Sequence, residues 1–225
     1  SAARTRQPDF GLQLAASQDI RILGPLAAAI QHSASVGEAL NTASRYLFVQ
    51  SPALVFSIHH RSTLVPGAVE LRVEVLLPRA PVRQIMDQCL GDLHRILQFL
   101  AQDNYELHAV ALPHTPTAKL RNYSKFFGAQ VHADREHGGL HVSAATLGAG
   151  LGAVNQSLRN MALDYLNRHY ADPGLSTVDR VRRALGSTLG SGSKQAIADL
   201  LFVHPRTLQR KLAREGALFE SLRDE

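Results

Sequence analysis

Cysteine and long apolar stretches are both scarce in this sequence of 225 residues. Cys89 is the only cysteine, so no internal disulfide can form, and such sparse use of cysteine is typical of the reducing cytoplasm. No apolar run reaches the roughly 18 residues that a membrane-spanning helix requires. The stretch Ser1–Pro8 is polar and basic, which predicts no signal peptide. We therefore expect a cytoplasmic protein without a membrane partner.

The composition is that of an ordinary globular protein with an excess of positive charge. Hydrophobic residues make up 45% of the chain and charged residues 19%, and the formal net charge is +5. A basic chain favours an acidic partner, of which nucleic acid is the commonest. Because many proteins are equally basic, the charge supports this interpretation only if it is concentrated on one element.

The first 150 residues are predicted to form an α+β domain, a small antiparallel sheet with packed helices. Their apolar residues repeat at helical spacing, then alternate as in strands, and later return to helical spacing. Ser35 is predicted to cap one helix, with Glu38 completing a capping box. The predicted strands are residues 54–58, 69–77, 107–112, 131 and 140–142, and the predicted helices are 9–16, 26–32, 36–49, 81–102 and 116–127.

Beyond residue 150 the strand pattern stops, and every predicted element is a helix. We assign residues 151–192 to a helical linker region and residues 193–225 to a smaller all-α subdomain. Gly148–Gly152 resembles a phosphate-binding loop only superficially, because it follows no long strand and lacks the Lys-Ser or Lys-Thr pair. We interpret it as a flexible linker between the two parts.

The stretch Lys194–Gly216 has the pattern of a helix-turn-helix. Ser193 is a candidate N-cap, and Ile197 and Leu201 form an apolar pair on the first helix. The three residues Phe202–His204 are a turn of the length that this motif needs. Pro205 suits the first position of the next helix, where its missing N–H would be unpaired in any case.

The second helix of this motif, Pro205–Glu215, has an apolar side and a cationic side. Leu208 and Leu212 fall on one side, while Arg206, Gln209 and Arg210 fall on another. Arginine and glutamine carry donors that match the edges of guanine and adenine in the major groove. From the pattern alone, a recognition helix and an ordinary basic surface helix remain equally good interpretations.

This stretch resembles the first helix-turn-helix of the AraC/XylS family of transcription regulators. The matching residues are Ile197-Ala198, Leu201, Pro205–Arg210, Leu212 and Glu215-Gly216. The first part of the chain is similar to the arabinose-binding-type N-terminal domain of such regulators. The residues that carry this second similarity are Pro8–Leu12, Ile22–Pro25, Gly37–Leu40, Arg45-Tyr46, Tyr123 and Phe127-Gly128.

The resemblance implies a sensor that binds a small effector or dimerises, followed by two helix-turn-helix units that bind double-stranded promoter or operator DNA. It places Arg206, Gln209 and Arg210 at positions that contact bases, with Thr207 beside them. Leu208 and Leu212 match the positions that hold the recognition helix to its partner helix. We interpret the two remaining cations of this helix, Lys211 and Arg214, as phosphate contacts.

Three features depart from the family pattern. Phe202 stands in the turn where the family commonly has glycine, and a bulky residue there must avoid positive φ. His204 stands where a serine usually caps the recognition helix, and histidine is a poorer cap. The sequence stops at Glu225, before a second helix-turn-helix, so we expect a fragment that binds its operator much more weakly than the complete chain.

Other polar residues are not predicted to form a catalytic or metal site. His132, His137 and His141 lie close in sequence, but no cysteine or acidic pair accompanies them at zinc spacing. Cys89 is expected to be a buried packing residue, and Asp87 and Asp92 are expected on a solvated helix surface. We therefore expect no catalytic residues, no metal and no cofactor.

An effector cavity between the strands and the long helix is one possibility, edged by His59, Arg72 or Tyr46, and a packed core without a ligand is the other. The sequence singles out no effector-binding residue. Our first hypothesis is a DNA-binding transcription regulator with a sensor domain, expected as a homodimer. The alternative is an oligomerisation or interaction module of a truncated regulator with little DNA binding of its own. An enzyme with a helical appendage has little support.

Overall fold

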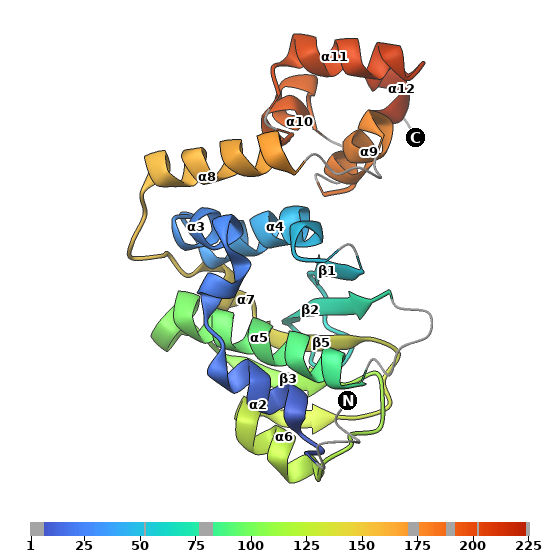
Figure 1. Cartoon of the computed structure of the whole chain (residues 1–225). Helices are drawn as coiled ribbons and strands as arrows, with labels where there is room; N and C mark the ends of the chain where they lie inside the picture. The colour runs from blue at the N-terminus through green and yellow to red at the C-terminus, as the bar shows by residue number, and fades with distance from the viewer. Residues whose placement is uncertain are drawn as a thin grey trace. The chain divides into compact units, whose positions relative to one another are not determined.

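The computed structural model describes residues 7–51, 53–76, 83–170, 176–187, 192–201 and 203–223 (Figure 1). The chain divides into two compact units, unit 1 from Ser1 to Leu166 and unit 2 from Asn167 to Glu225. Phe202, which departs from the family pattern, lies outside the described residues.

A five-stranded mixed sheet forms the centre of unit 1. Its strand order is β1-β2-β5-β3-β4, and β3 and β4 are parallel while the other neighbours are antiparallel. The prediction of a purely antiparallel sheet is therefore wrong, because the helix between β3 and β4 returns the chain in the same direction. The strands are β1 Leu54–His59, β2 Ala68–Val75, β3 Leu107–Ala111, β4 Gln130–His132 and β5 Gly138–Ser143.

Helices surround this sheet at the positions that the apolar periodicity predicted, with shifted ends. The capped helix is shorter than predicted, because its last turn, Leu47–Val49, is a 3-10 helix. The helices are α2 Phe10–Ser17, η1 Ile20–Leu23, α3 Pro25–Gln31, α4 Val36–Tyr46, η2 Leu47–Val49, α5 Arg83–Ala101, η3 Gln102–Asn104, α6 Leu120–Phe127, α7 Ala144–Gly148 and α8 Gln156–His169. No helix among the described residues is long and apolar enough to cross a membrane.

One face of the sheet is apolar and contributes to the core that helix α5 completes. Leu71 pairs with Leu140 across β2 and β5, and both side chains are fully buried. Helix α5 contributes Leu90 and Leu97, which are equally buried. The sequence left open either an effector cavity or a packed core between the strands and the long helix. The structure shows a packed core there.

The other face of the sheet carries a buried polar network. Glu70 and His141 are neighbours across β2 and β5, and both are almost completely buried. Burial alone would raise the pKa of Glu70, but hydrogen bonds from Arg72 and Thr63 hold it below its ordinary value. The His141 ring nitrogen Nδ1 lies 2.7 Å from the Ser62 hydroxyl.

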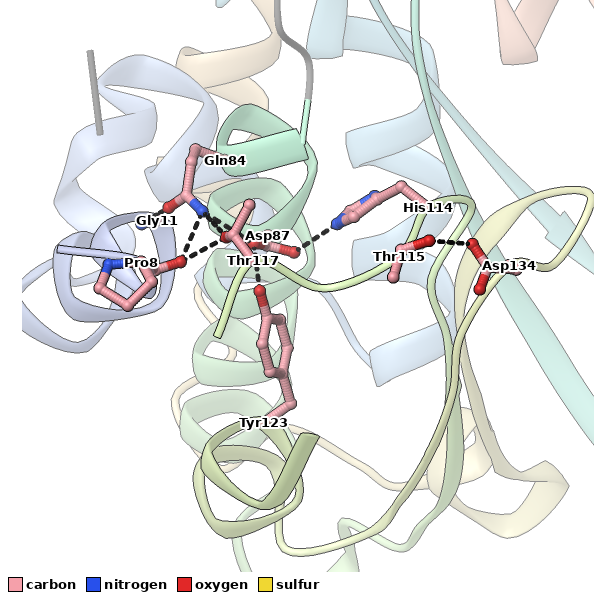
Figure 2. Close-up of polar contacts among 9 residues, drawn as sticks. All are labelled: Pro8, Gly11, Gln84, Asp87, His114, Thr115, Thr117, Tyr123 and Asp134. Atoms are coloured by element: carbon pink, nitrogen blue, oxygen red, sulfur yellow. Dashed lines mark hydrogen bonds and ion pairs between the residues drawn. The ribbon is translucent and has the colours of Figure 1, made fainter. Parts of the chain in front are cut away.

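Two glycines allow helix α2 to lie directly on α5, as the ribbons in Figure 1 show. A Cβ atom on Gly11 would lie 2.3 Å from the carbonyl oxygen of Gln84, and one on Gly91 would lie 2.6 Å from the Cβ of Ala15. Larger side chains at either position would push the helices apart. The amide of Gln84 fixes the pair further, since it accepts from the Gly11 N–H and donates to the Pro8 carbonyl (Figure 2).

The Asp87 carboxylate is buried in the middle of this packing, which corrects the prediction of a solvated position. It is 0% exposed. Its oxygens accept from the Tyr123 hydroxyl at 2.7 Å and lie 3.1 Å from Nε2 of His114 (Figure 2). Burial, followed by the bonded carboxylate, raises the pKa of Tyr123. Asp87 therefore joins α5 to α6 and to the segment after β3.

The segment Gly148–Gly152 is not the flexible linker that the sequence predicts. The Ala149 carbonyl accepts from the Val36 N–H at 2.9 Å, and the Leu151 N–H donates to the Ala34 carbonyl at 3.2 Å. This segment therefore pairs with the start of α4. At that start Ser35 caps the helix by accepting from the Glu38 N–H, as predicted.

Every regular element in the described part of unit 2 is a helix. Val181, Ile197, Leu208 and Phe219, one from each helix, belong to a core that is separate from that of unit 1. The helices are α9 Thr177–Ser187, α10 Lys194–Leu200, α11 Pro205–Arg214 and α12 Phe219–Arg223.

We predict that Asp87→Ala lowers the free energy of unfolding of unit 1 by about 2–5 kcal/mol, because it leaves the Tyr123 and His114 donors buried without an acceptor. Urea titration followed by circular dichroism measures the change. Asp103→Ala, at an exposed position on η3, is the matched control and should change stability by less than about 0.5 kcal/mol. Equal midpoints for the two variants would contradict a structural role for Asp87.

Candidate nucleic-acid interface

Helices α10 and α11 begin where the sequence predicts, each with a side-chain cap. Ser193 accepts from the Ala196 N–H at 3.1 Å at the start of α10. His204 accepts from the Arg206 N–H through its ring nitrogen Nδ1 at 3.2 Å. Histidine therefore does cap α11, and Pro205 follows at the first helical position, where its missing N–H leaves no donor unpaired.

Leu208 and Leu212 fix how α11 is rotated. Each is 1% exposed and belongs to the core of unit 2. Ala198 of α10, at 0% exposure, is small enough for the two helices to approach closely. With its leucines on the inside, α11 must present the opposite side to solvent.

The side chains that the sequence predicts as base contacts lie together on that outer side. Arg206, Gln209 and Arg210 are exposed, and Thr207 is half-buried beside them. All four line one open hollow of about 470 Å³, together with His204 and Ala213. No acidic side chain among the described residues forms an ion pair with Arg206 or Arg210, so their charges are available to a partner.

Lys211 and Arg214 extend the positive charge along the flank of α11. Both are exposed, and neither lines the hollow. Both lie in the last turn of the helix, where cations are also favoured by the helix dipole. Between Arg206 and Arg214 the helix carries four cations and no acid. The excess charge of the chain is thus concentrated on one short element.

Glu215 ties this helix to α9, a role that sequence reasoning missed. Its carboxylate accepts from the N–H groups of Thr177 and Val178, at 2.9 and 3.0 Å, and from the Thr177 hydroxyl. The hydrogen bond from the Thr177 hydroxyl is the main reason that the pKa of Glu215 lies below its ordinary value. The partners lie 37 and 38 residues away, so no local pattern could have revealed them.

The residues named as edges of an effector cavity do not come together around one. Tyr46 is 3% exposed and is part of the apolar core of unit 1. His59 and Arg72 lie on the polar face of the sheet instead. Three or more side chains arranged to hold a metal ion are not found among the described residues.

Comparison with known proteins places this geometry in a family. Residues 1–151 match the model described as the arabinose-binding domain of AraC transcription regulators, N-terminal. The chain is 32% identical over 221 residues to the HTH-type transcriptional regulator VirS of Mycobacterium tuberculosis, in strains CDC 1551 / Oshkosh and ATCC 25618 / H37Rv. The alignment covers 96% of this chain and 64% of those relatives.

A solved structure shares the fold. The chain resembles the transcriptional regulator CdpR from Pseudomonas aeruginosa with a TM-score of 0.63 at 18% identity, over 96% of this chain and 70% of that one. The family model and the VirS relatives define a member of a regulator family rather than of an enzyme family. The chain belongs to the AraC family of transcription regulators, and its first 151 residues are the arabinose-binding-type N-terminal domain of that family.

We predict that Glu215→Ala lowers the free energy of unfolding of unit 2 by about 1 kcal/mol, the usual effect of removing a helix cap. Because the pKa of Glu215 is lowered by folding, its contribution is present above its ordinary value of 4.5 and is lost as the pH falls through the folded value.

Thermal unfolding of the natural chain and of Glu215→Ala between pH 7 and pH 3 tests this pH dependence. The difference should be largest at neutral pH and should vanish at the acid end. Asp199→Ala, which removes an exposed carboxylate bonded to the Gln195 amide, serves as the control. A difference that grows toward acid would contradict the assignment.

Proposed function

We propose that this chain is a sequence-specific DNA-binding regulator in which α11 is the recognition helix of a helix-turn-helix formed with α10. The observation that supports this best is the outward placement of Arg206, Gln209 and Arg210, opposite Leu208 and Leu212. A helix with this division can enter the major groove of promoter DNA without giving up its own packing.

The side chains of the outer face suit direct reading of bases. Arg206 and Arg210 can each donate two hydrogen bonds to O6 and N7 of guanine, and Gln209 can pair with N6 and N7 of adenine. Thr207, half-buried at the edge of the same hollow, offers a methyl and a hydroxyl group to a neighbouring base or phosphate. Its partial burial limits how far it can reach.

Lys211 and Arg214 have a different proposed role. Their exposed position on the flank of α11 is suited to phosphate oxygens, which supply affinity without choosing a sequence. Binding by such contacts weakens as salt rises, because bound counterions are released from the DNA.

Unit 1 is proposed as the sensor that responds to a small effector. The support is the family of its first 151 residues, whose described activity in the matched model is binding of arabinose. A regulator of this kind acts where the chromosome is, which agrees with the reducing compartment that the single cysteine predicts.

A second proposed role of unit 1 is to pair two copies of the chain through α8. On α8 itself Leu158, Met161 and Tyr165 are 45%, 67% and 44% exposed, although the opposite side of the helix packs through Leu163 and Leu166. Their spacing of three and four residues is the spacing with which two like helices interlock. Ser157, Asn160 and Ala162 beside them are uncharged, and the exposed charged residues of the next turn, Asp164 and Arg168, are of opposite sign.

We predict that the double variant Arg206→Ala, Arg210→Ala loses sequence-specific DNA binding. Two base contacts at about 1 kcal/mol or more each amount to a weakening of roughly thirtyfold or more. Mobility-shift titration on promoter fragments, with random DNA as competitor, measures it.

The control for this experiment is Arg61→Ala, Arg121→Ala, which removes the same charge from exposed positions of unit 1. It should keep the preference for the specific fragment. If both double variants bind the specific fragment as the natural chain does, α11 is not the reading element. An unchanged helical circular dichroism signal and unchanged self-association in the α11 variant would show that both units remain folded.

For α8, we predict that Leu158→Glu, Met161→Glu raises the dimer dissociation constant at least tenfold, because four charges would face one another across the paired helices. Sedimentation velocity over a range of concentrations measures it. Val55→Glu, Leu76→Glu alters exposed apolar positions elsewhere in unit 1 and should leave association unchanged. A natural chain that stays monomeric at all concentrations would rule out this dimer.

A further inference from the structure

A cleft of about 250 Å³ lies between the N-terminal segment of unit 1 and helix α5. Gln18 and Ile22 line it from the segment that joins α2, η1 and α3, while Asp92, Ile96 and Phe99 line it from α5. The three α5 residues follow at spacings of four and three, so they share one side of the helix. The cleft is distinct from the packed space between α5 and the sheet.

Asp92 is the half-buried charge of this cleft, which corrects its prediction as a fully solvated residue. With its amide nitrogen turned toward α5, Gln18 donates to both carboxylate oxygens, at 2.9 and 3.1 Å. No cation among the described residues forms an ion pair with Asp92. The hydrogen-bond partners of this carboxylate, the amides of Gln18 and Gln88, are neutral, and burial raises the pKa of Asp92 to about 6.

The two arginines at the cleft do not neutralise this carboxylate. Arg21 is bonded through Nε to both oxygens of Asp19, and its side chain is 86% exposed. Arg95 is exposed as well, and its Nη1 lies 3.4 Å from the side-chain oxygen of Gln98. Asp92 is therefore more buried than either arginine of the cleft, and its charge is negative.

Apolar surface lies beside that charge. Phe99 and Ile22 are 55% and 41% exposed, although both are large hydrophobic residues, and Ile96 is half-buried between Phe99 and Asp92 on the helix. Because Phe99 lies two helical turns from Asp92, a ligand whose charged group binds the carboxylate can lay an apolar body along Ile96 toward the ring. A purely ionic ligand would leave the apolar side of the cleft without a partner.

We propose that this cleft binds a small organic cation, a protonated amine on a short aliphatic body, with its ammonium group on Asp92 and its carbon atoms against Ile96 and Phe99. The assignment rests on the proposed effector response of unit 1, for which it names the site and the class of ligand. A buried carboxylate that lacks a cation lowers the stability of the folded protein, and binding sites are where proteins retain such groups.

The test is isothermal titration of the 225-residue chain with n-butylamine at pH 8, with n-butanol and sodium butyrate as the neutral and anionic counterparts. The amine should bind, and the other two should not. L-Norvaline distinguishes a free amine from an amino acid: tighter binding than butylamine identifies a zwitterion whose carboxylate meets Arg95, and weaker binding identifies a simple amine. Either outcome supports a cation site.

Two variants locate the site. Asp92→Asn keeps the shape and should weaken butylamine binding at least tenfold, whereas Asp103→Asn, at an exposed position outside the cleft, should bind normally. Phe99→Ala should weaken butylamine binding but leave the weaker binding of methylamine unchanged. Binding by Asp92→Asn at full strength, an equal response to butyrate, or no response to any cation would overturn the proposal.

The pH dependence of amine binding is an independent test of the role of Asp92. The amine stays protonated across the range, so binding should weaken between pH 8 and pH 5 as Asp92 takes up a proton near pH 6. Asp19 and Arg21, which also line the cleft with Arg95, keep their charge over this range, because the hydrogen bonds between them lower the pKa of Asp19 and raise that of Arg21. The titration contains no DNA, so a negative result does not affect the DNA-binding proposal. Likewise, the DNA-binding result for the α11 variant does not bear on the proposal for the cleft.

Discussion

Burial of Leu208 and Leu212 is the constraint on which the functional surface depends. A helix of ten residues has few stable ways to lie on a small core, and two leucines one turn apart choose among them. Once they are inside, the positions of Arg206, Gln209 and Arg210 follow from helical geometry alone. Hydrogen bonds from the start of α9 to the Glu215 carboxylate then hold the C-terminal end of α11. The helix is therefore fixed both by its buried side and by its C-terminus.

The parts of the structure that local patterns determine were predictable, and α11 is the clearest of them. Its start depends on His204 and Pro205, and its orientation depends on two leucines, all within a few residues of the site that they position. The apolar alternation of β1 and β2 is equally local, and both strands lie where it predicts them. The direction of β4 is not local. Three residues read the same in a parallel or an antiparallel pair, and only the packing of α6 decides the outcome.

Asp87 and Asp92 show what local sequence patterns do not predict, namely the burial of a polar residue. A carboxylate on a helix is ordinarily solvated, and both residues share α5 with many polar neighbours. What distinguishes Asp87 is a tyrosine 36 residues away and a histidine 27 residues away, which meet it only after the chain has folded. Asp92 differs from it in being only half-buried and in bonding to the amides of Gln18 and Gln88, which lie close to it in the folded unit. Asp87 therefore has a structural role, whereas the Asp92 carboxylate has no cationic partner among the described residues.

Residues that follow the cleft in the chain contact α8. The chain runs from Gln31 at the cleft directly to Ser33, and Arg159 of α8 reaches both the Ser33 hydroxyl and, at 2.7 Å, the carboxylate of Glu38. A ligand that binds the folded arrangement of α2, η1 and α5 stabilises that arrangement by mass action. We expect that repacking of this segment would move Ser33, a partner of Arg159, and that a ligand would then shift the position of α8 in proportion to its differential affinity for the two packings. The apolar side of α8 that we propose for pairing would thereby be coupled to the cleft through a short, continuous set of contacts within unit 1.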